Sequence, residues 1–192
     1  YITPEVEAKQ IQILERWFGS NIDPVQDHRT LGLAVAIITE YNKVYPYETF
    51  EILQTDDGKP LVEVTFDLPL FTYEQQELIH VHYCGKVDMV FQKDGQVFTL
   101  DHKTTFQFGD TFYQQEMMSA QHPGYGWALS QTLDKPIAGF CINGIRVRKR
   151  DEDKPPVVAD DFSRSWNYYK DGDIEEWRQD TITIISEWID RV

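Results

Sequence analysis

The chain has 192 residues, of which 41% are apolar and 14% aromatic, and this is enough to bury a core, so we expect a single domain over residues 1–192. Eighteen Lys and Arg residues against thirty-two Asp and Glu residues give a formal net charge of −14, which excludes a protein that coats nucleic acid through a broad basic surface. Two cysteines, Cys84 and Cys141, exclude a four-cysteine zinc site or iron–sulfur cluster.

The first half of the sequence predicts two helices followed by a run of strands. Residues 4–18 have helical apolar spacing, and residues 29–45 predict a largely buried second helix after a loop at 21–28. From about residue 48 the pattern becomes extended, and turn residues separate the runs. We expect consecutive antiparallel strands over residues 47–55, 60–70, 78–92 and 96–104.

The second half returns to helical patterning. Residues 112–133 predict a helix that Pro123 kinks or restarts, because proline removes a backbone hydrogen bond. A strand at 137–149, a loop at 160–169 and an amphipathic helix at 173–192 follow. The order predicts the α+β class, an α/β sandwich whose mixed, mainly antiparallel sheet is flanked by helices. We expect a helical part to about residue 45, a core at 46–150, and a C-terminal loop and helix at 151–192.

The hairpin around Asp94-Gly95 carries two aspartates at positions that otherwise look buried. If Asp94-Gly95 forms a two-residue type I′ turn, Lys93 faces Gln96 and Asp88 faces Asp101. Facing side chains have Cβ atoms about 5 Å apart, so two like charges there destabilise the pair unless something lies between them. The hairpin therefore predicts a bound partner for these carboxylates.

Lys103 lies on the same strand face as Asp101, because side chains alternate along a strand. Two carboxylates beside one ammonium suit a divalent cation with oxygen ligands, Mg²⁺ or Mn²⁺, and metal-assisted hydrolysis of a phosphodiester. The simpler alternative is an ordinary ion pair between Asp101 and Lys103, with Asp88 in solvent.

Three segments in order, GKVDMVF, GQVFTLDHKTT and QHPGY, resemble the RecB-like branch of the PD-(D/E)XK nuclease superfamily over roughly residues 60–130. The resemblance implies a restriction-endonuclease-like core and a metal-dependent deoxyribonuclease, an exonuclease in many relatives. It makes Asp88, Asp101 and the main-chain carbonyl of His102 metal ligands, and Lys103 the residue that positions the attacking water. Gln121 and Tyr125 match the helix motif that places the substrate or the lysine.

Glu63 matches the upstream acidic position that often completes such a site, although a plain exposed residue in a strand would look the same. One position departs from the family, because many relatives carry a histidine where this chain has Ala36. Glu40, one turn later, is a weaker substitute. Without this histidine, the site could bind one metal ion instead of two. Alternatively, the protein could be a catalytically inactive nuclease fold that binds DNA or assembles with other proteins.

Other patterns allow other sites. His80, His82, Cys84 and Asp88 would share one face of an unbroken strand, a zinc-like arrangement. Arg164 and Tyr168 lie in the predicted loop and are candidates for substrate contact, since exposed aromatics can stack on bases. The basic run at 146–150 is either a phosphate-contacting edge or a solvated strand end.

No apolar run approaches the roughly 18 residues of a membrane span, and the first residues lack the pattern of a signal peptide, so we expect a cytoplasmic protein without a membrane partner. By resemblance, its partner is DNA, its host is bacterial or phage-infected, and it can form a homo-oligomer or join a larger helicase or recombination assembly.

Overall fold

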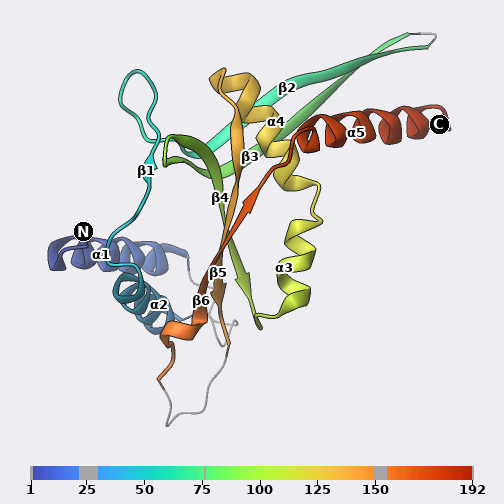
Figure 1. The fold of residues 1–192 in the computed structure, drawn as a ribbon. Coiled ribbons are helices and arrows are strands. Elements are labelled where there is room, and N and C mark those ends of the chain that lie inside the picture. Colours follow the sequence, from blue (N-terminus) through green and yellow to red (C-terminus); the bar gives the residue numbers. More distant parts are fainter. Residues whose placement is uncertain (1, 22–29, 76, 149–154, 192) are drawn as a thin grey trace. The chain divides into compact units, whose positions relative to one another are not determined.

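The computed structural model describes residues 2–21, 30–75, 77–148 and 155–191, and Figure 1 shows their fold. The chain gathers into two compact units. The first takes residues 1–49, 104–108 and 144–163, and the second takes residues 50–103, 109–143 and 164–192. The residues proposed for the site, from Glu63 to Tyr168, belong to the second unit, whereas the substitute ligand Glu40 belongs to the first. Within the described residues, no helix is long and apolar enough to cross a bilayer.

The first unit is built on helices α1 (Pro4–Asn21) and α2 (Leu31–Val44) and the short 3₁₀ helix η1 (Ala159–Asp161). Thr30 caps α2, since its hydroxyl accepts a hydrogen bond from the Leu33 N–H at 3.1 Å. Arg146 Nε donates to the buried Asp161 carboxylate at 2.7 Å. Arg146 is therefore engaged inside the unit. Lys149 and Arg150 of the basic run, and the loop predicted before α2, lie outside the described residues.

In the described residues, six strands form one sheet in the order β1-β3-β4-β5-β6, and β2 also pairs with β3. The long β3 has two partners on one edge, because its last residues pair with the short β1 while the rest pairs antiparallel with β2. Helices α3 and α4 connect β4 to its neighbour β5, the kind of crossover that joins parallel strands. The strands are β1 (Glu51–Ile52), β2 (Val62–Glu74), β3 (Leu78–Lys93), β4 (Gln96–Thr105), β5 (Ile137–Arg146) and β6 (Phe162–Tyr168).

The β3–β4 hairpin has the predicted register. Asp94 and Gly95 have φ angles of 51° and 78°, so both central residues are left-handed, as a type I′ turn requires. The ladder runs from Lys93 opposite Gln96 to Met89 opposite Leu100. The ladder ends there, one pair short of Asp88 and Asp101.

Helices α3 (Asp110–Met117), α4 (Gln121–Leu133) and α5 (Asp173–Ile189) belong to the second unit. The predicted restart near Pro123 is confirmed, because α3 ends before a new helix begins at Gln121. Pro123 falls in the first turn of α4, where the missing N–H has no intrahelical partner to lose. The α3–α4 break puts side chains of both helices beside the end of β4.

The sheet of the second unit packs on both faces. Helices α4 and α5 cover one face with Tyr125, Trp127, Ala128, Leu129 and Trp177 against strand residues that include Val87, Val90 and Val97. Phe91, Phe98, Leu100 and Cys141 form a second cluster with Phe50 and Trp166. The predicted α+β class with a mostly antiparallel sheet and flanking helices is confirmed.

Two elements differ from the sequence prediction. The segment predicted as a loop at 160–169 contains strand β6, half-buried beside β5. Its apolar residues Phe162, Trp166 and Tyr168 alternate with polar ones, but Arg164 interrupts the apolar series and hides the period. The strand predicted at 47–55 shrinks to Glu51–Ile52, because only the end of β3 remains to pair with it.

Candidate active site

Lys103 is the centre of a polar cluster at the end of β4. Its Nζ lies 2.6 Å from Asp101 Oδ2 and 3.0 Å from Gln121 Oε1, to which it donates a hydrogen bond. The Asp101 contact is an ion pair and not an aligned hydrogen bond, since Oδ2 receives no well-aligned donor among the described residues. Burial by itself lowers the pKa of Lys103, but Asp101, with help from Glu116, raises it above its usual value. Lys103 is therefore an ammonium at neutral pH.

Tyr125 fixes the orientation of the Gln121 amide. Gln121 Nε2 lies 2.6 Å from the Tyr125 hydroxyl, one helical turn away on the same face of α4. With the amide nitrogen committed to that hydroxyl, the carbonyl oxygen faces the ammonium. The Tyr125 side chain is buried, so the anchor is rigid. The sequence predicted this helix motif, and the structure brings it to Lys103.

Two glycines of the motifs let α4 approach β3 closely. A Cβ on Gly85 would lie 2.5 Å from a Phe66 ring carbon and 3.3 Å from a Tyr125 ring carbon. A Cβ on Gly124 would lie 2.3 Å from the Tyr83 hydroxyl and 2.7 Å from the Trp177 ring. The shortest of these distances would be steric clashes, so only glycine, which has no side chain, fits at either position. The glycines thereby seat Tyr125 beside the strands that carry the aspartates.

Asp88 lies where β3 and β4 separate. The ladder ends at the pair of Met89 and Leu100, and beyond it Asp88 Oδ2 accepts a hydrogen bond from the His102 N–H at 2.8 Å. The carboxylate takes the place of a strand carbonyl there. Asp88 is thus held against the main chain of β4, between the positions of Asp101 and Lys103. A carboxylate offers about four lone-pair directions, so this bond leaves capacity for another partner.

Glu63 falls opposite Asp88 on the other neighbouring strand. Val62 pairs with Met89 and Val64 pairs with Val87, which places Glu63 in the row of Asp88 and Asp101. Its φ of 53° interrupts the strand geometry at that point. The exposed Glu63 carboxylate forms an ion pair with Lys86, which raises the pKa of Lys86. The structure therefore brings Glu63 to the row, but with a lysine as its partner.

Glu116 and His122 join the cluster and were missed as site residues from the sequence. Glu116 Oε2 lies 4.0 Å from Lys103 Nζ and 3.3 Å from His122 Nε2. The His122 side chain is fully buried, and burial lowers the pKa of His122, opposed by Asp101 and Glu116, so the ring is neutral at neutral pH. The missed signal was a carboxylate five residues before Gln121 and a histidine directly after it.

Arg164 and Tyr168 lie on β6 and not in a loop. Arg164 Nε donates to the side-chain oxygen Oδ1 of Asn143 at 3.4 Å, and its guanidinium lies 5.5 Å from the centre of the Phe50 ring. Asn143 is fully buried, and its Nδ2 lies 2.7 Å from His102 Nδ1. Arg164 thus orients the amide that holds the His102 ring. Tyr168 is 60% exposed and accessible to a ligand.

The alternative zinc group on β3 does not assemble. His80 Nδ1 lies 3.2 Å from the Thr72 hydroxyl, and His82 Nδ1 lies 2.6 Å from Asp67 Oδ1. Asp67 also interacts with Cys84 and raises the pKa of its thiol. In the part of the chain that the structure describes, the group of three metal-ligating side chains is Asp101, Glu116 and His122. Glu40, the weaker substitute, forms an ion pair with Lys43 in the first unit.

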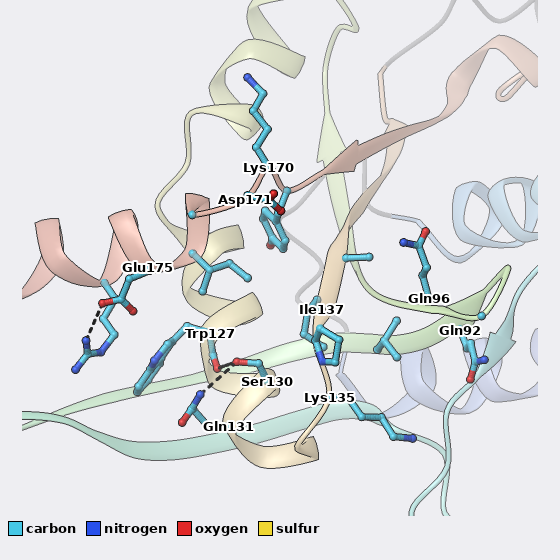
Figure 2. Close-up of a pocket in the computed structure, with 18 of the residues that line it drawn as sticks. Gln92, Gln96, Trp127, Ser130, Gln131, Lys135, Ile137, Lys170, Asp171 and Glu175 are labelled. Carbon is cyan, nitrogen blue, oxygen red and sulfur yellow. Dashed lines mark hydrogen bonds and ion pairs between the residues drawn. The ribbon is translucent and has the colours of Figure 1, made fainter.

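A cleft of about 1110 Å³ lies elsewhere in the second unit, and Figure 2 shows the side chains that line it. It is bordered by the hairpin turn, α4 and the start of α5, with Lys135, Lys170 and Arg178 among its charged residues. None of the residues proposed from the sequence lines it. The polar cluster around Lys103 is therefore distinct from this cleft.

Comparison with known proteins assigns no family. The sequence matches no known family and no curated protein. Among solved structures, the protein titled "Crystal structure of SSO0001" is similar with a TM-score of 0.35 and 11% identity, over 94% of this chain and 68% of that one. A likeness this low does not assign a function.

Proposed function

We propose that this protein is a metal-dependent DNA nuclease, with its reaction centre at Asp88, Asp101 and Lys103. The observation that carries the proposal is the position of Lys103, whose ammonium lies between the buried Asp101 carboxylate and the Gln121 amide that Tyr125 orients. An isolated surface ion pair needs no such support. The same residues carry the resemblance to RecB-like nucleases, so geometry and motif favour one chemistry.

The donors around Lys103 fit a hard divalent cation. Asp101 Oδ2 is buried without an aligned hydrogen-bond donor among the described residues, and carboxylate oxygens are the ligands that Mg²⁺ and Mn²⁺ prefer. Asp101, Asp88 and the carbonyl of His102 would hold the ion, and Glu63 would join them on leaving Lys86. When bound, the ion offsets charge on the scissile phosphate and lowers the pKa of a water ligand.

The protein's own groups supply orientation and charge. Lys103 stays protonated because Asp101 raises its pKa, so it acts as a hydrogen-bond donor and not as a base. It orients the attacking water and stabilises the negative charge that develops as this water passes its proton to solvent. Gln121 restricts the ammonium to that position. Tyr168, exposed on β6, can stack on a base of the substrate.

The test is cleavage of DNA by purified protein. Linear DNA labelled at one end and a covalently closed circle are incubated with Mg²⁺, with Mn²⁺ and with EDTA. We expect release of nucleotides from the linear DNA with either metal, no release in EDTA, and an intact circle, because the resemblance implies an exonuclease. Asp88→Asn should slow release at least about a hundredfold, since the ion loses a charged ligand.

Asp67→Asn is the matched control, because Asp67 is an exposed carboxylate on β2 that pairs with His82. It should retain cleavage. If the wild-type protein and both variants bind DNA without cutting it in any metal, the proposal fails and a catalytically inactive binding module takes its place. Equal cleavage by Asp88→Asn and wild type would remove Asp88 from the site.

A further inference from the structure

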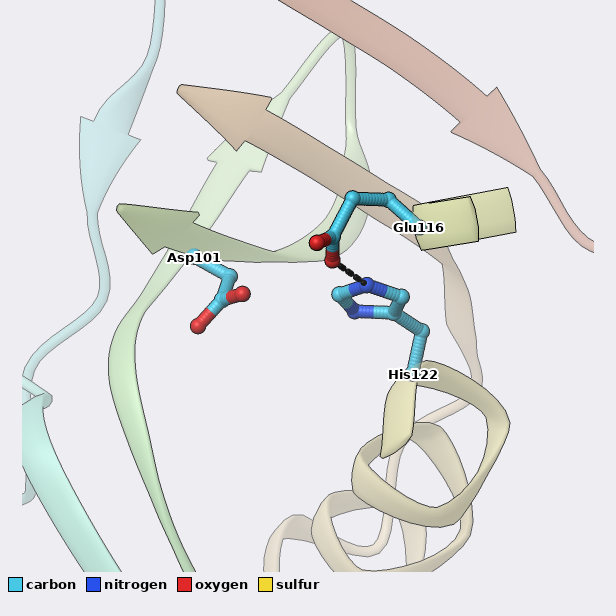
Figure 3. Close-up of side chains that lie close together, drawn as sticks. All are labelled: Asp101, Glu116 and His122. Carbon is cyan, nitrogen blue, oxygen red and sulfur yellow. Dashed lines mark hydrogen bonds and ion pairs between the residues drawn. The ribbon is translucent and has the colours of Figure 1, made fainter. Parts of the chain in front are cut away.

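We infer that Asp101, Glu116 and His122 form a metal site that binds a first-row transition ion, with Mn²⁺ as its accessible probe. Figure 3 shows the three side chains, from β4, α3 and α4, directed toward one space. One ligand atom from each lies within 4.8 Å of the others. The site shares Asp101 with the proposed reaction centre, but it takes its other ligands from the two helices and does not depend on cleavage.

An unpartnered carboxylate oxygen in the group points to a ligand. Asp101 Oδ2 is buried and has no aligned hydrogen-bond donor among the described residues. Buried polar atoms are nearly always satisfied, so this oxygen calls for a partner besides the Lys103 ammonium. His122 is fully buried and turns Nε2 toward Glu116 at 3.3 Å, which adds a nitrogen donor to the two carboxylates.

The histidine is held as a fixed ligand. Its ring stacks on Phe140 with centroids 4.1 Å apart and planes 5° from parallel. The Tyr169 hydroxyl donates to the His122 carbonyl oxygen at 2.6 Å, which fixes the main chain at the start of α4. A ligand ring whose plane and backbone are both fixed binds an ion without a further loss of side-chain freedom.

The spacing of the ligand atoms is close to that of a bound ion. Ligands at about 2.1 Å from one ion lie roughly 3 Å apart when adjacent and 4.2 Å apart when opposite, so atoms within 4.8 Å of one another must move closer for all three to bind. Glu116, in the last turn of α3, and the long Lys103 side chain are the groups able to move. Lys103 Nζ lies 2.6 Å from Asp101 and 4.0 Å from Glu116, and therefore competes with an ion for both carboxylates.

The donor set selects the class of ion. Two carboxylates and a neutral imidazole give mixed oxygen and nitrogen ligation, which suits Mn²⁺, Fe²⁺, Co²⁺ and Zn²⁺, whereas Mg²⁺ prefers oxygen alone. We therefore expect tighter binding of Mn²⁺ than of Mg²⁺ at this site. The oxygen-only donors around Asp88 carry no such preference.

The test is electron spin-echo spectroscopy of the wild-type protein with substoichiometric Mn²⁺ and no DNA. A directly bound imidazole produces a ¹⁴N modulation of the Mn²⁺ echo, and oxygen ligands do not. We expect this modulation in wild type and its loss in His122→Asn. His102→Asn is the matched control, because His102 lies beside Asp101 on β4 but outside the three-residue group, and it should keep the modulation.

Affinity measurements on variants of Glu116 and of the competing Lys103 guard against a misfolded His122→Asn. Glu116→Gln should raise the Kd for Mn²⁺ about tenfold or more. Lys103→Met should leave the Kd unchanged or lower it, because it removes the competing ammonium. Absence of the nitrogen modulation from wild type, its loss only in His102→Asn, or an unchanged Kd in Glu116→Gln would each overturn the inference. DNA cleavage that persists in those cases would leave the proposed nuclease intact.

Discussion

Replacement of Lys103 by methionine should reduce the rate of DNA cleavage by roughly a hundred- to a thousandfold, the usual range for loss of one donor that stabilises developing negative charge. Methionine keeps much of the apolar length of lysine, so it preserves packing while it removes the ammonium. The lost interaction is the one that stabilises the developing charge on the attacking water. Rates under single-turnover conditions measure this effect without interference from product release.

Lys93→Met provides the matched control for this variant. Lys93 lies on the same hairpin and pairs with the neighbouring Asp94, away from the cluster. Its replacement should leave the cleavage rate within about twofold of wild type and should preserve the metal requirement. A Lys103→Met protein that cleaves as fast as Lys93→Met would show that the ammonium has no part in the reaction.

Asp101→Asn should have a comparable or larger effect on cleavage, about a thousandfold or more, because each 1.4 kcal/mol of lost transition-state stabilisation costs a factor of ten and a metal contributes several kcal/mol. Asparagine preserves the shape of the side chain and removes its charge. DNA binding should persist, since the carboxylate repels phosphate. Parallel measurements of cleavage rate and DNA affinity separate the two effects.

Asp101→Asn also tests whether the Asp101–Lys103 ion pair stabilises the fold. Asp101 is 6% exposed and forms an ion pair with Lys103, so its loss should lower the free energy of unfolding by about 1 to 3 kcal/mol. Glu116, 4.0 Å from Lys103, limits that loss by remaining as a second counter-charge. Asp94→Asn is the control, because Asn-Gly suits a type I′ turn as well as Asp-Gly does. If Asp101→Asn matches it in cleavage, the proposed role of Asp101 is refuted.

The hairpin could be predicted because its information is local. Asp94-Gly95 determines the turn, the turn determines the register, and alternation then assigns Asp101 and Lys103 to one face. The spacing of Gln121 and Tyr125 is also local, since residues four apart share a helix face. These short-range rules give each pair separately, and only the resemblance to RecB-like nucleases joined the lysine and its amide partner in one hypothesis.

The remaining features depend on contacts that no local rule gives. Asp88 accepts the His102 N–H because the two strands separate at that pair, and the sequence contains no signal for the separation. Glu63 forms an ion pair with Lys86. The alternation of side chains along a strand does not show whether Glu63 contacts this lysine or joins the aspartates. Glu116 and His122 meet only because α3 ends and α4 restarts at a particular angle. Each of these depends on tertiary geometry.

Strand β6 was predicted as a loop because its apolar pattern is interrupted. Arg164 interrupts its apolar alternation, yet the guanidinium is accommodated by the Phe50 ring and the buried Asn143 amide. A strand that contains a charged residue is thus easily predicted as a loop when the partners of that residue come from distant segments. The predicted substrate role of Arg164 and Tyr168 remains a prediction, and their position on the sheet replaces the expected loop.

The central claim is that Asp88 and Asp101 together bind a divalent cation beside Lys103. A crystal of the protein soaked in Mn²⁺ and measured near the manganese absorption edge tests this directly. We expect an anomalous peak at about 2.2 Å from a carboxylate oxygen of each aspartate, with Lys103 Nζ nearby but not bound to the ion. Anomalous density with no peak in contact with Asp88, and with that carboxylate still occupied only by the His102 N–H, would contradict it.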